Sequence, residues 1–440
     1  MDKRTFIKGL AVAGSSLPFT LSAGSQPLSA MAEWIARHES RSSAADAPTG
    51  LPPGAALAAD EDFWAGIRSG YRLKPDYINL ENGYYNILPE QTLEAFIRHV
   101  REVNYEGAYY MRTVQYERKQ AVAARLAMIA GCSPGELVIT RNTTESLDMI
   151  IAGYPWASGD EAIIALQDYG AMLQMFRQVS HRHGVVCRTV SLPNHPAGDE
   201  ELVTLYEKAI TPRTRLLMVS HMVNVTGQIL PVRKIADMAH AHGVEVMVDG
   251  AHSFAHIRHS IPGLGCDYYG ASLHKWLSVP LGAGILYVRK ELTNKIWPLL
   301  AEADGAEGIA RLNHTGTLPV HTDLAINDAI DYYTTLGPER KEARLRYLQQ
   351  YWTGQVRPMP NVILNTPAEP GRTCAIANVG IKGIMPGDLA ARLLHQYKIY
   401  TVAIDMPDAG VQGCRITPNI FTLPSELDSF VAALKEMATA

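Results

Sequence analysis

Two residues of this sequence, Asp249 and Lys275, could act as an acid and as an amine, and the residues around each of them favour that role. Asp249 ends a short apolar run, residues 246–248, and is followed by Gly250. Such a run predicts a buried strand of a parallel sheet, and open α/β sheets bind ligands at the carboxyl ends of their strands. Lys275 lies among apolar and small residues, a setting that disfavours the charged ammonium.

An acid at a strand end and a partly buried lysine are what pyridoxal phosphate (PLP) requires. The lysine holds the aldehyde as a Schiff base, and the acid keeps the pyridine nitrogen protonated so that the ring can accept carbanion electrons. Each residue also fits a structural role, because a strand-end Asp can cap a turn and a Lys can pack its stem on Trp276. The two residues alone do not distinguish PLP chemistry from these structural roles, so further residues of a PLP site are needed.

A phosphate site is the next feature that such chemistry needs. The pattern predicts a strand over residues 136–140, followed by Asn142 and Glu145 in the spacing of a capping box at a helix start. Thr143 and Thr144 then lie in the first helical turn, where free backbone amides and the helix dipole favour a phosphate. An ordinary helix cap gives the same pattern, so the cap is expected in either case.

Together with the segments below, these residues resemble the fold-type I PLP enzymes, and within them the class V aminotransferase family. That family includes cysteine desulfurases, kynureninase-like enzymes and isopenicillin N epimerase-like proteins, and the last branch is the most similar. The resemblance runs from about Asn79 to Arg415. It implies an α/β fold, with a mostly parallel sheet of the seven-stranded type in a large domain and a small C-terminal α+β domain.

The resemblance also implies a set of cofactor contacts. Lys275 would be the Schiff-base lysine and proton carrier, Asp249 would hold the pyridinium, and Tyr169 would stack on the ring. Asn224 and His252 would lie near the phenolic oxygen. The phosphate would be bound by Thr143, Thr144, Ser272 and His274, and by Gly316 and Thr317 of a second subunit, which implies a homodimer with shared active sites.

Substrate contacts are expected from other segments. Arg415 matches the arginine by which the family binds a substrate carboxylate, a role that suits its planar fork, although a surface salt bridge is the alternative. Tyr84, Tyr85 and Arg112 are further candidates for the substrate pocket. The expected substrate is a small-molecule amino acid or a peptide-derived compound.

Several reactions remain open. Lys275 could remove an α-proton and so serve an aminotransferase, an epimerase or a lyase. A desulfurase is disfavoured because residues 401–413, upstream of Arg415, contain no cysteine. One alternative is a periplasmic enzyme that modifies a secreted peptide metabolite such as a siderophore. A non-catalytic PLP or amino-acid binding protein is the other, although simple binding would need neither Lys275 nor Asp249.

The N-terminus predicts export. A basic start around Lys3 and Arg4, a moderately apolar run and small residues at Ala30 and Ala32 give residues 1–32 the layout of a twin-arginine-like signal peptide. We expect a periplasmic protein, or a cytoplasmic one if the signal is not used. The expected domain boundaries are a linker over residues 33–60, a PLP-binding large domain over residues 61–325, and a small domain over residues 326–440.

Composition excludes some other classes. With 440 residues, 47% hydrophobic and 19% charged, the chain suits a large and a smaller globular domain. Its net charge of −4 gives no reason to expect nucleic acid, and no apolar run of the mature chain is long enough to span a bilayer. His252 and His256 have the i, i+4 spacing of metal ligands, but no third ligand follows at a suitable spacing, so no metal is expected.

Overall fold

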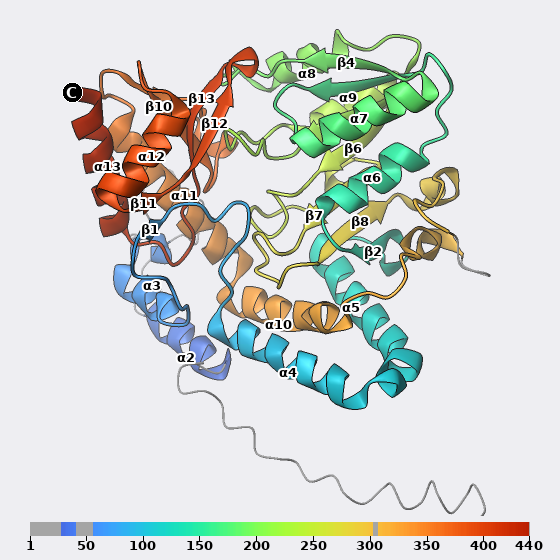
Figure 1. Ribbon diagram of the computed structural model, residues 1–440, viewed down its shortest axis with the longest axis horizontal. Helices are drawn as coiled ribbons and strands as arrows, with labels where there is room; N and C mark the ends of the chain where they lie inside the picture. Colours follow the sequence, from blue (N-terminus) through green and yellow to red (C-terminus); the bar gives the residue numbers. More distant parts are fainter. Residues whose placement is uncertain (1–27, 41–55, 302–306, 440) are drawn as a thin grey trace, which may run out of the picture.

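The computed structural model describes residues 28–40, 56–301 and 307–439, and it is built around a sheet of seven strands (Figure 1). The strand order is β2-β8-β7-β6-β5-β3-β4. The strands are β2 (Leu137–Thr140), β3 (Glu161–Ala165), β4 (Val186–Val190), β5 (Thr214–Ser220), β6 (Glu245–Asp249), β7 (Tyr268–Ser272) and β8 (Gly284–Val288). β3 to β7 run parallel, whereas β8 is antiparallel to both of its neighbours, β2 and β7.

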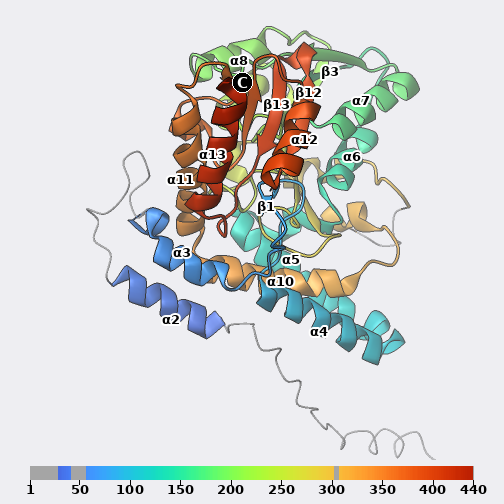
Figure 2. The same cartoon turned by 60° about the vertical axis from the view of Figure 1, so that its left-hand side comes forward.

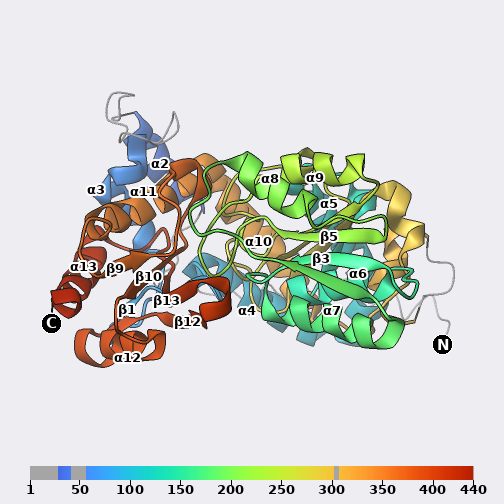
Figure 3. The ribbon, with the colours of Figure 1, turned by 90° about the horizontal axis from the view of Figure 1, so that it is seen from above.

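Helices cover both faces of this sheet, as Figure 3 shows for α6 and α7 on one face and α8 and α9 on the other. The helices that follow the strands are α6 (Thr143–Gly153), α7 (Gly170–His183), α8 (Asp199–Glu207) and α9 (Val232–Ala241). Both faces of the sheet are buried, and this explains why β6 is apolar throughout. Successive side chains of a strand point to opposite faces, so Val246 and Val248 pack into the apolar core on one face and Met247 into the core on the other.

Three long helices complete the large domain. They are α4 (Glu90–Glu106), α5 (Gln115–Ala130) and α10 (Val320–Leu336), and α10 packs against the other two. The sequence predicts helices over residues 90–105 and 114–130, and the structure confirms both as α4 and α5. The expected boundary between residues 325 and 326 falls inside α10, whose apolar residues Ile326 and Ile330 pack into the core of the large domain.

The C-terminal part has its own antiparallel sheet, in the order β12-β13-β10-β9, and its own apolar core. The strands are β9 (Val362–Leu364), β10 (Ala377–Ile381), β12 (Val402–Met406) and β13 (Val411–Ile416), and the helices are α11 (Pro338–Val356), α12 (Pro386–Tyr397) and α13 (Pro424–Thr439). An early segment, β1 (Ile78–Asn79), pairs with β11 (Ile399–Tyr400), and Glu81 bridges to Thr417. The N-terminal segment thus joins the C-terminal part.

The expected linker is structured over part of its length. Helix α2 (Leu28–Glu39) crosses the expected boundary at residue 32 and packs beside α3 (Glu61–Arg68) (Figure 2). Met31 and Ile35, four residues apart on one helix face, are buried, and the Trp34 indole N–H donates to the Phe63 carbonyl at 3.3 Å. Residues 1–27 and 41–55, with the basic start and the apolar run of the expected signal, lie outside the described residues.

Within the described ranges, no helix is both long enough and apolar enough to cross a membrane.

Candidate active site

A cavity of about 290 Å³ lies where strands of the large sheet end and face the C-terminal sheet. Ser220, Asp249 and Ser272 are the last residues of β5, β6 and β7, and all three line it, while Arg415 reaches it from β13. The predicted residues that line the cavity are Tyr84, Thr143, Thr144, Tyr169, Asn224, Asp249, His252, Ser272, His274, Lys275 and Arg415. The structure therefore brings together most of the site that the sequence predicted.

Lys275 follows β7 and carries the amine of the site. Burial lowers the pKa of Lys275 from 10.5 to about 8; the positive charge of Arg415 adds to this effect, and Asp249 and Glu81 oppose it. The Lys275 Nζ lies 3.2 Å from the His252 Nε2. A substantial fraction of this amine is therefore neutral near physiological pH, as a nucleophile or a base must be.

Asp249 is buried and is held by the backbone that follows it. Its Oδ1 accepts a hydrogen bond from the Ala251 N–H at 2.9 Å, and burial raises the pKa of the carboxyl. A β-carbon on Gly250 would lie 1.9 Å from the Tyr269 ring, so only glycine fits directly after this acid. The carboxylate is thus rigidly placed, and it has one protein donor.

The expected phosphate end of the cavity is built from the start of α6 and the end of β7. The Asn142 side chain caps α6 by accepting from the Glu145 N–H at 2.9 Å. The Thr143 N–H donates to the Ser272 Oγ at 2.9 Å, and the Thr143 and Ser272 hydroxyls are 2.7 Å apart. Two hydroxyls at the N-terminus of a helix form a site that suits a phosphate.

His274 adds an unsatisfied group to the cavity wall. Its Nδ1 is buried and has no hydrogen-bond partner among the residues that the structure describes, and burial lowers the pKa of the imidazole to about 4. The ring is therefore a neutral part of the cavity wall. The Thr143–Ser272 hydroxyls, the Lys275 amine with its lowered pKa and the Asp249 carboxylate together fit PLP.

The capping box expected at Asn142 is only half formed. Glu145 does not reach back to the amide of Asn142; its Oε2 accepts from the Arg141 N–H at 2.6 Å instead, and its Oε1 accepts from the Arg141 guanidinium at 2.8 and 3.0 Å. Arg141 is an attractive partner because it stands four residues before Glu145, at ion-pair spacing. The Arg141–Glu145 pair also borders the cavity, since Arg141 lines it.

Arg415 lines the cavity as predicted, but its guanidinium already binds a carboxylate. Its Nη2 and Nε donate to Glu81 at 2.7 and 3.2 Å, and its Nη1 donates to the Asn224 carbonyl at 3.3 Å. A guanidinium has five N–H donors, so two remain for a ligand. The side chains of Arg415 and Glu81 are only 8% and 5% exposed.

Sequence analysis did not identify Glu81, although it stands three residues before Tyr84, which was predicted to contact the substrate. Its Oε1 also accepts from the Gly83 and Tyr84 N–H groups, at 3.1 and 2.9 Å. One carboxylate therefore fixes both Arg415 and the segment that carries Tyr84 to the cavity mouth. Tyr84 is 69% exposed there and Tyr169, at the start of α7, is 41% exposed.

A second unpredicted acid lies behind the site. Asp168 is buried; its Oδ1 accepts from the Ser220 hydroxyl at 2.9 Å and its Oδ2 from the Ala165 N–H at 2.7 Å. Burial raises the pKa of Asp168 to about 7, and the charge of Asp249 adds to this. The sequence had drawn attention only to the neighbouring Tyr169.

Four predicted residues lie away from the cavity. Tyr85 does not line it, and Arg112 is exposed in the π-helical turn Tyr110–Val114, so their predicted contacts with a substrate stay predictions. Gly316 and Thr317 are exposed in the segment before α10. Their predicted role belongs to the site of a second subunit and stays a prediction.

The fold and the cavity together define a fold-type I PLP enzyme, and the chain belongs to the aminotransferase class-V family, whose model matches residues 90–403. It is 28% identical to isopenicillin N epimerase of Streptomyces clavuligerus over 392 residues, which cover 84% of this chain and 97% of the relative. PLP is the cofactor that this family implies and that the residues of the cavity fit.

Two solved structures show the same fold. The apo cysteine desulfurase from Thermococcus onnurineus NA1 superposes with a TM-score of 0.76 at 21% identity, covering 89% of this chain and 99% of the other. The C-DES protein, in a mutant with glycine covalently linked to its PLP cofactor, superposes with a TM-score of 0.74 at 20% identity, covering 82% and 97%. The fold is thus shared by enzymes with different reactions.

Proposed function

We propose that this PLP-dependent enzyme acts at the α-carbon of an amino acid or an amino-acid-derived compound, as an aminotransferase or an epimerase. The observation that carries this proposal is the amine of Lys275, which has a lowered pKa and shares one cavity with Asp249 and with the guanidinium of Arg415. These three groups supply a base, a partner for the pyridine nitrogen and a carboxylate contact.

Bound PLP supplies an electron sink for the pair left behind when a bond to the α-carbon breaks. The Asp249 carboxylate, rigidly held by the Ala251 amide, keeps a proton on the ring nitrogen. Lys275, with a pKa of about 8, can take the α-proton near neutral pH and return it. The two free donors of Arg415 orient the carboxylate of the substrate.

The position that is reprotonated would decide the reaction. Inversion would require a proton donor other than Lys275 on the opposite face of the α-carbon, whereas amino transfer would require Lys275 to deliver the proton to the cofactor instead. The relationship with isopenicillin N epimerase supports the first outcome, at 28% identity over nearly the whole of that protein.

Desulfurase chemistry gains no support from the cysteines, although desulfurases share the fold. Cys414 is buried beside Arg415, with its Sγ 3.7 Å from the Pro386 carbonyl, and burial raises its pKa to about 11. A buried thiol with a raised pKa is a poor nucleophile.

A second candidate is a periplasmic enzyme that modifies a secreted peptide metabolite such as a siderophore. The cavity mouth supports it, because Tyr84, Tyr169 and Leu281 are 69%, 41% and 62% exposed and leave an open rim for a ligand larger than a free amino acid. We propose export through the twin-arginine-like signal and a homodimer completed by Gly316 and Thr317 for both candidate functions. A periplasmic reporter fused to residues 1–33 tests export; retention in the cytoplasm would contradict it.

The absorption spectrum of the purified protein with PLP tests the main proposal. We expect a lysine-linked chromophore that responds to one member of a panel of L- and D-amino acids and peptides ending in Glu. Lasting conversion to the pyridoxamine form would identify an aminotransferase and its donor. A shift that returns, with inverted product, would identify an epimerase. No lysine-linked chromophore would favour the non-catalytic binding protein.

A further inference from the structure

Trp276, the residue after Lys275, is fully buried and makes a directional contact with His252. Its indole N–H donates to the His252 Nδ1 at 3.4 Å. An indole nitrogen is a donor only, so this Nδ1 must accept and carries no proton. Burial holds the pKa of His252 well below its ordinary value, so the ring is neutral and its single proton is on Nε2.

The protonated Nε2 of His252 faces the Lys275 amine, 3.2 Å away. An N–H group can donate to the lone pair of a neutral amine, but it cannot bond to an ammonium, which has no lone pair. In the other tautomer the bare Nε2 would accept a hydrogen bond from the ammonium and stabilise it. The tautomer of His252 therefore biases the protonation of Lys275.

A second histidine keeps Trp276 in place. The ring of His256 stacks on the indole, with ring centroids 3.6 Å apart and an interplanar angle of 24°. The His256 Nε2 accepts from the Ala375 N–H at 3.1 Å, so its Nδ1 carries the proton and donates to the His252 carbonyl at 2.7 Å. Both ring nitrogens of His256 are thus used within the protein.

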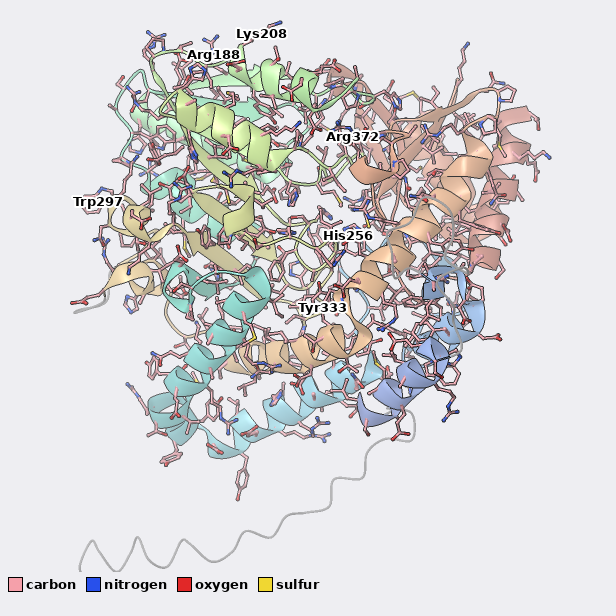
Figure 4. The ribbon with its side chains drawn as sticks, turned by 180° about the vertical axis from the view of Figure 1, so that it is seen from behind. Arg188, Lys208, His256, Trp297, Tyr333 and Arg372 are labelled. Carbon is pink, nitrogen blue, oxygen red and sulfur yellow. The ribbon has the colours of Figure 1, made fainter. Side chains whose placement is uncertain are left out.

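The chain of contacts reaches from the cavity into the C-terminal part. Figure 4 shows His256 between the loops of the large sheet and the C-terminal part, which supplies the Ala375 amide. His252, His256 and Trp276 are 4%, 2% and 0% exposed, so water does not compete for these hydrogen bonds. Each of the three side chains therefore has its hydrogen-bond partner within the protein, and the Nε2 of His252 faces Lys275.

We propose that Trp276 is a positioning residue that selects the His252 tautomer with its N–H toward Lys275, and thereby keeps the lysine amine neutral and reactive. The inference deepens the proposed function, because it rests on the role given there to Lys275. Apart from His252, the charged and titratable groups that act on this amine are Asp249, Glu81, Arg415 and His274. None of them donates a hydrogen bond to the amine in the described structure.

The first test is made on the cofactor-free protein and needs no activity. Nitrogen NMR of histidine labelled with 15N distinguishes protonated from bare ring nitrogens, and the His252→Gln variant identifies the signals of His252. We expect a bare Nδ1 and a protonated Nε2 in the wild-type protein. A proton on Nδ1 would overturn the proposal, whatever the enzyme does. In Trp276→Phe we expect the Nδ1-protonated form to appear, and an unchanged tautomer would also overturn the proposal.

The second test measures how fast the lysine captures PLP as a function of pH, from the growth of the linked chromophore. Trp276→Phe should shift the midpoint of capture upward by about one pH unit, so that capture is roughly tenfold slower at pH 7 and equal to wild type well above pH 9. Trp352→Phe is the matched control, because Trp352 is equally buried and its indole N–H has no partner.

The outcomes separate the two proposals. Equal slowing at every pH, or the same shift in Trp352→Phe, would mean loss of packing and would overturn the role of Trp276. Wild-type protein that never links PLP would contradict the proposed function, while the tautomer measured by NMR would still decide the arrangement of Trp276 and His252. Thermal unfolding checks that the variant is folded; if it is not, the wild-type tautomer alone remains a sufficient test.

Discussion

The two ends of the cavity differ in how far the protein satisfies its own polar groups. We name the two ends after the roles proposed for them. At the cofactor end the side chain of Asp249 accepts one hydrogen bond from the residues that the structure describes, and the His274 Nδ1 accepts and donates none. At the substrate end Arg415 and Glu81 are paired, and the same carboxylate binds two backbone amides. The protein thus satisfies its own polar groups more fully at the substrate end.

The two arginines that border the cavity show the same contrast. Arg141 and Glu145 are four residues apart; the Arg141 side chain is 54% exposed, although that of Glu145 is only 6% exposed. Arg415 and Glu81 come from distant parts of the chain and are both buried. An ion pair whose arginine is in solvent adds about 1 kcal/mol or less, while breaking a pair that is buried on both sides costs about 3–5 kcal/mol because a charge is left alone. We therefore expect different responses to matched substitutions at the two ends.

The largest effect is expected for Lys275→Ala. Loss of the amine should lower turnover by about 10³-fold or more and abolish the lysine-linked absorption, while PLP still binds without a covalent link. Steady-state rates and absorption spectra measure both. Lys295→Met is the control, because Lys295 pairs with Glu245 away from the cavity. Unchanged turnover in Lys275→Ala would contradict the proposed mechanism.

Glu81→Gln should act mainly on stability and on the substrate. Leaving Arg415 without its carboxylate should lower the free energy of unfolding by about 3 kcal/mol, and freeing the segment of Tyr84 should weaken binding of carboxylate ligands roughly tenfold. Denaturant unfolding and spectral titration with the amino acid measure these changes.

Glu145→Gln is the matched variant at the other end, and it should cost about 1 kcal/mol because Arg141 is half exposed. Equal losses of stability in the two variants would remove the contrast between the ends of the cavity.

Ser272→Ala should weaken PLP binding by about tenfold, since it removes one hydroxyl from the Thr143–Ser272 pair. Equilibrium binding of PLP measures the effect. Ser146→Ala is the control, because Ser146 lies on the same helix α6 but bonds to the Ile285 carbonyl away from the cavity. A loss of affinity in Ser146→Ala as large as in Ser272→Ala would place the phosphate elsewhere.

The last prediction concerns Asp168, whose effect on stability depends on pH. Its pKa is about 7 in the folded protein against an ordinary value of 3.8, so the folded state binds more protons than the unfolded state between these values. Stability should therefore fall as pH rises from about 4 to 7, by roughly 3 kcal/mol from this group. In Asp168→Asn the stability should decrease less between pH 4 and 7. Melting temperatures of the two proteins, measured across that range, test this. An unchanged pH slope would show that Asp168 is ionised in the folded protein throughout that range.

The sequence predicted the cofactor end better than the substrate end. Lys275, Asp249 and the Thr143 turn are each signalled locally, by an apolar strand, a glycine or a helix cap, and the structure places them in one cavity. The pairing of Glu81 with Arg415 depends on the bridge between Glu81 and Thr417, which no local pattern reveals. Helix α2 was missed because its small residues resembled the end of a signal peptide, and only tertiary contacts show Met31 and Ile35 to be core residues.

The bridge between Glu81 and Thr417 also bears on how the protein is made. Chains emerge from the ribosome N-terminus first and fold as they emerge. Strands β2 to β8 can assemble early, but Glu81 must wait for Arg415, which is synthesised 334 residues after it, and for Thr417. A nascent chain can therefore form the Thr143–Ser272 pair long before it can form the Arg415–Glu81 pair. A ribosome that stalls before residue 415 would leave the proposed cofactor site without the proposed contact for the substrate carboxylate.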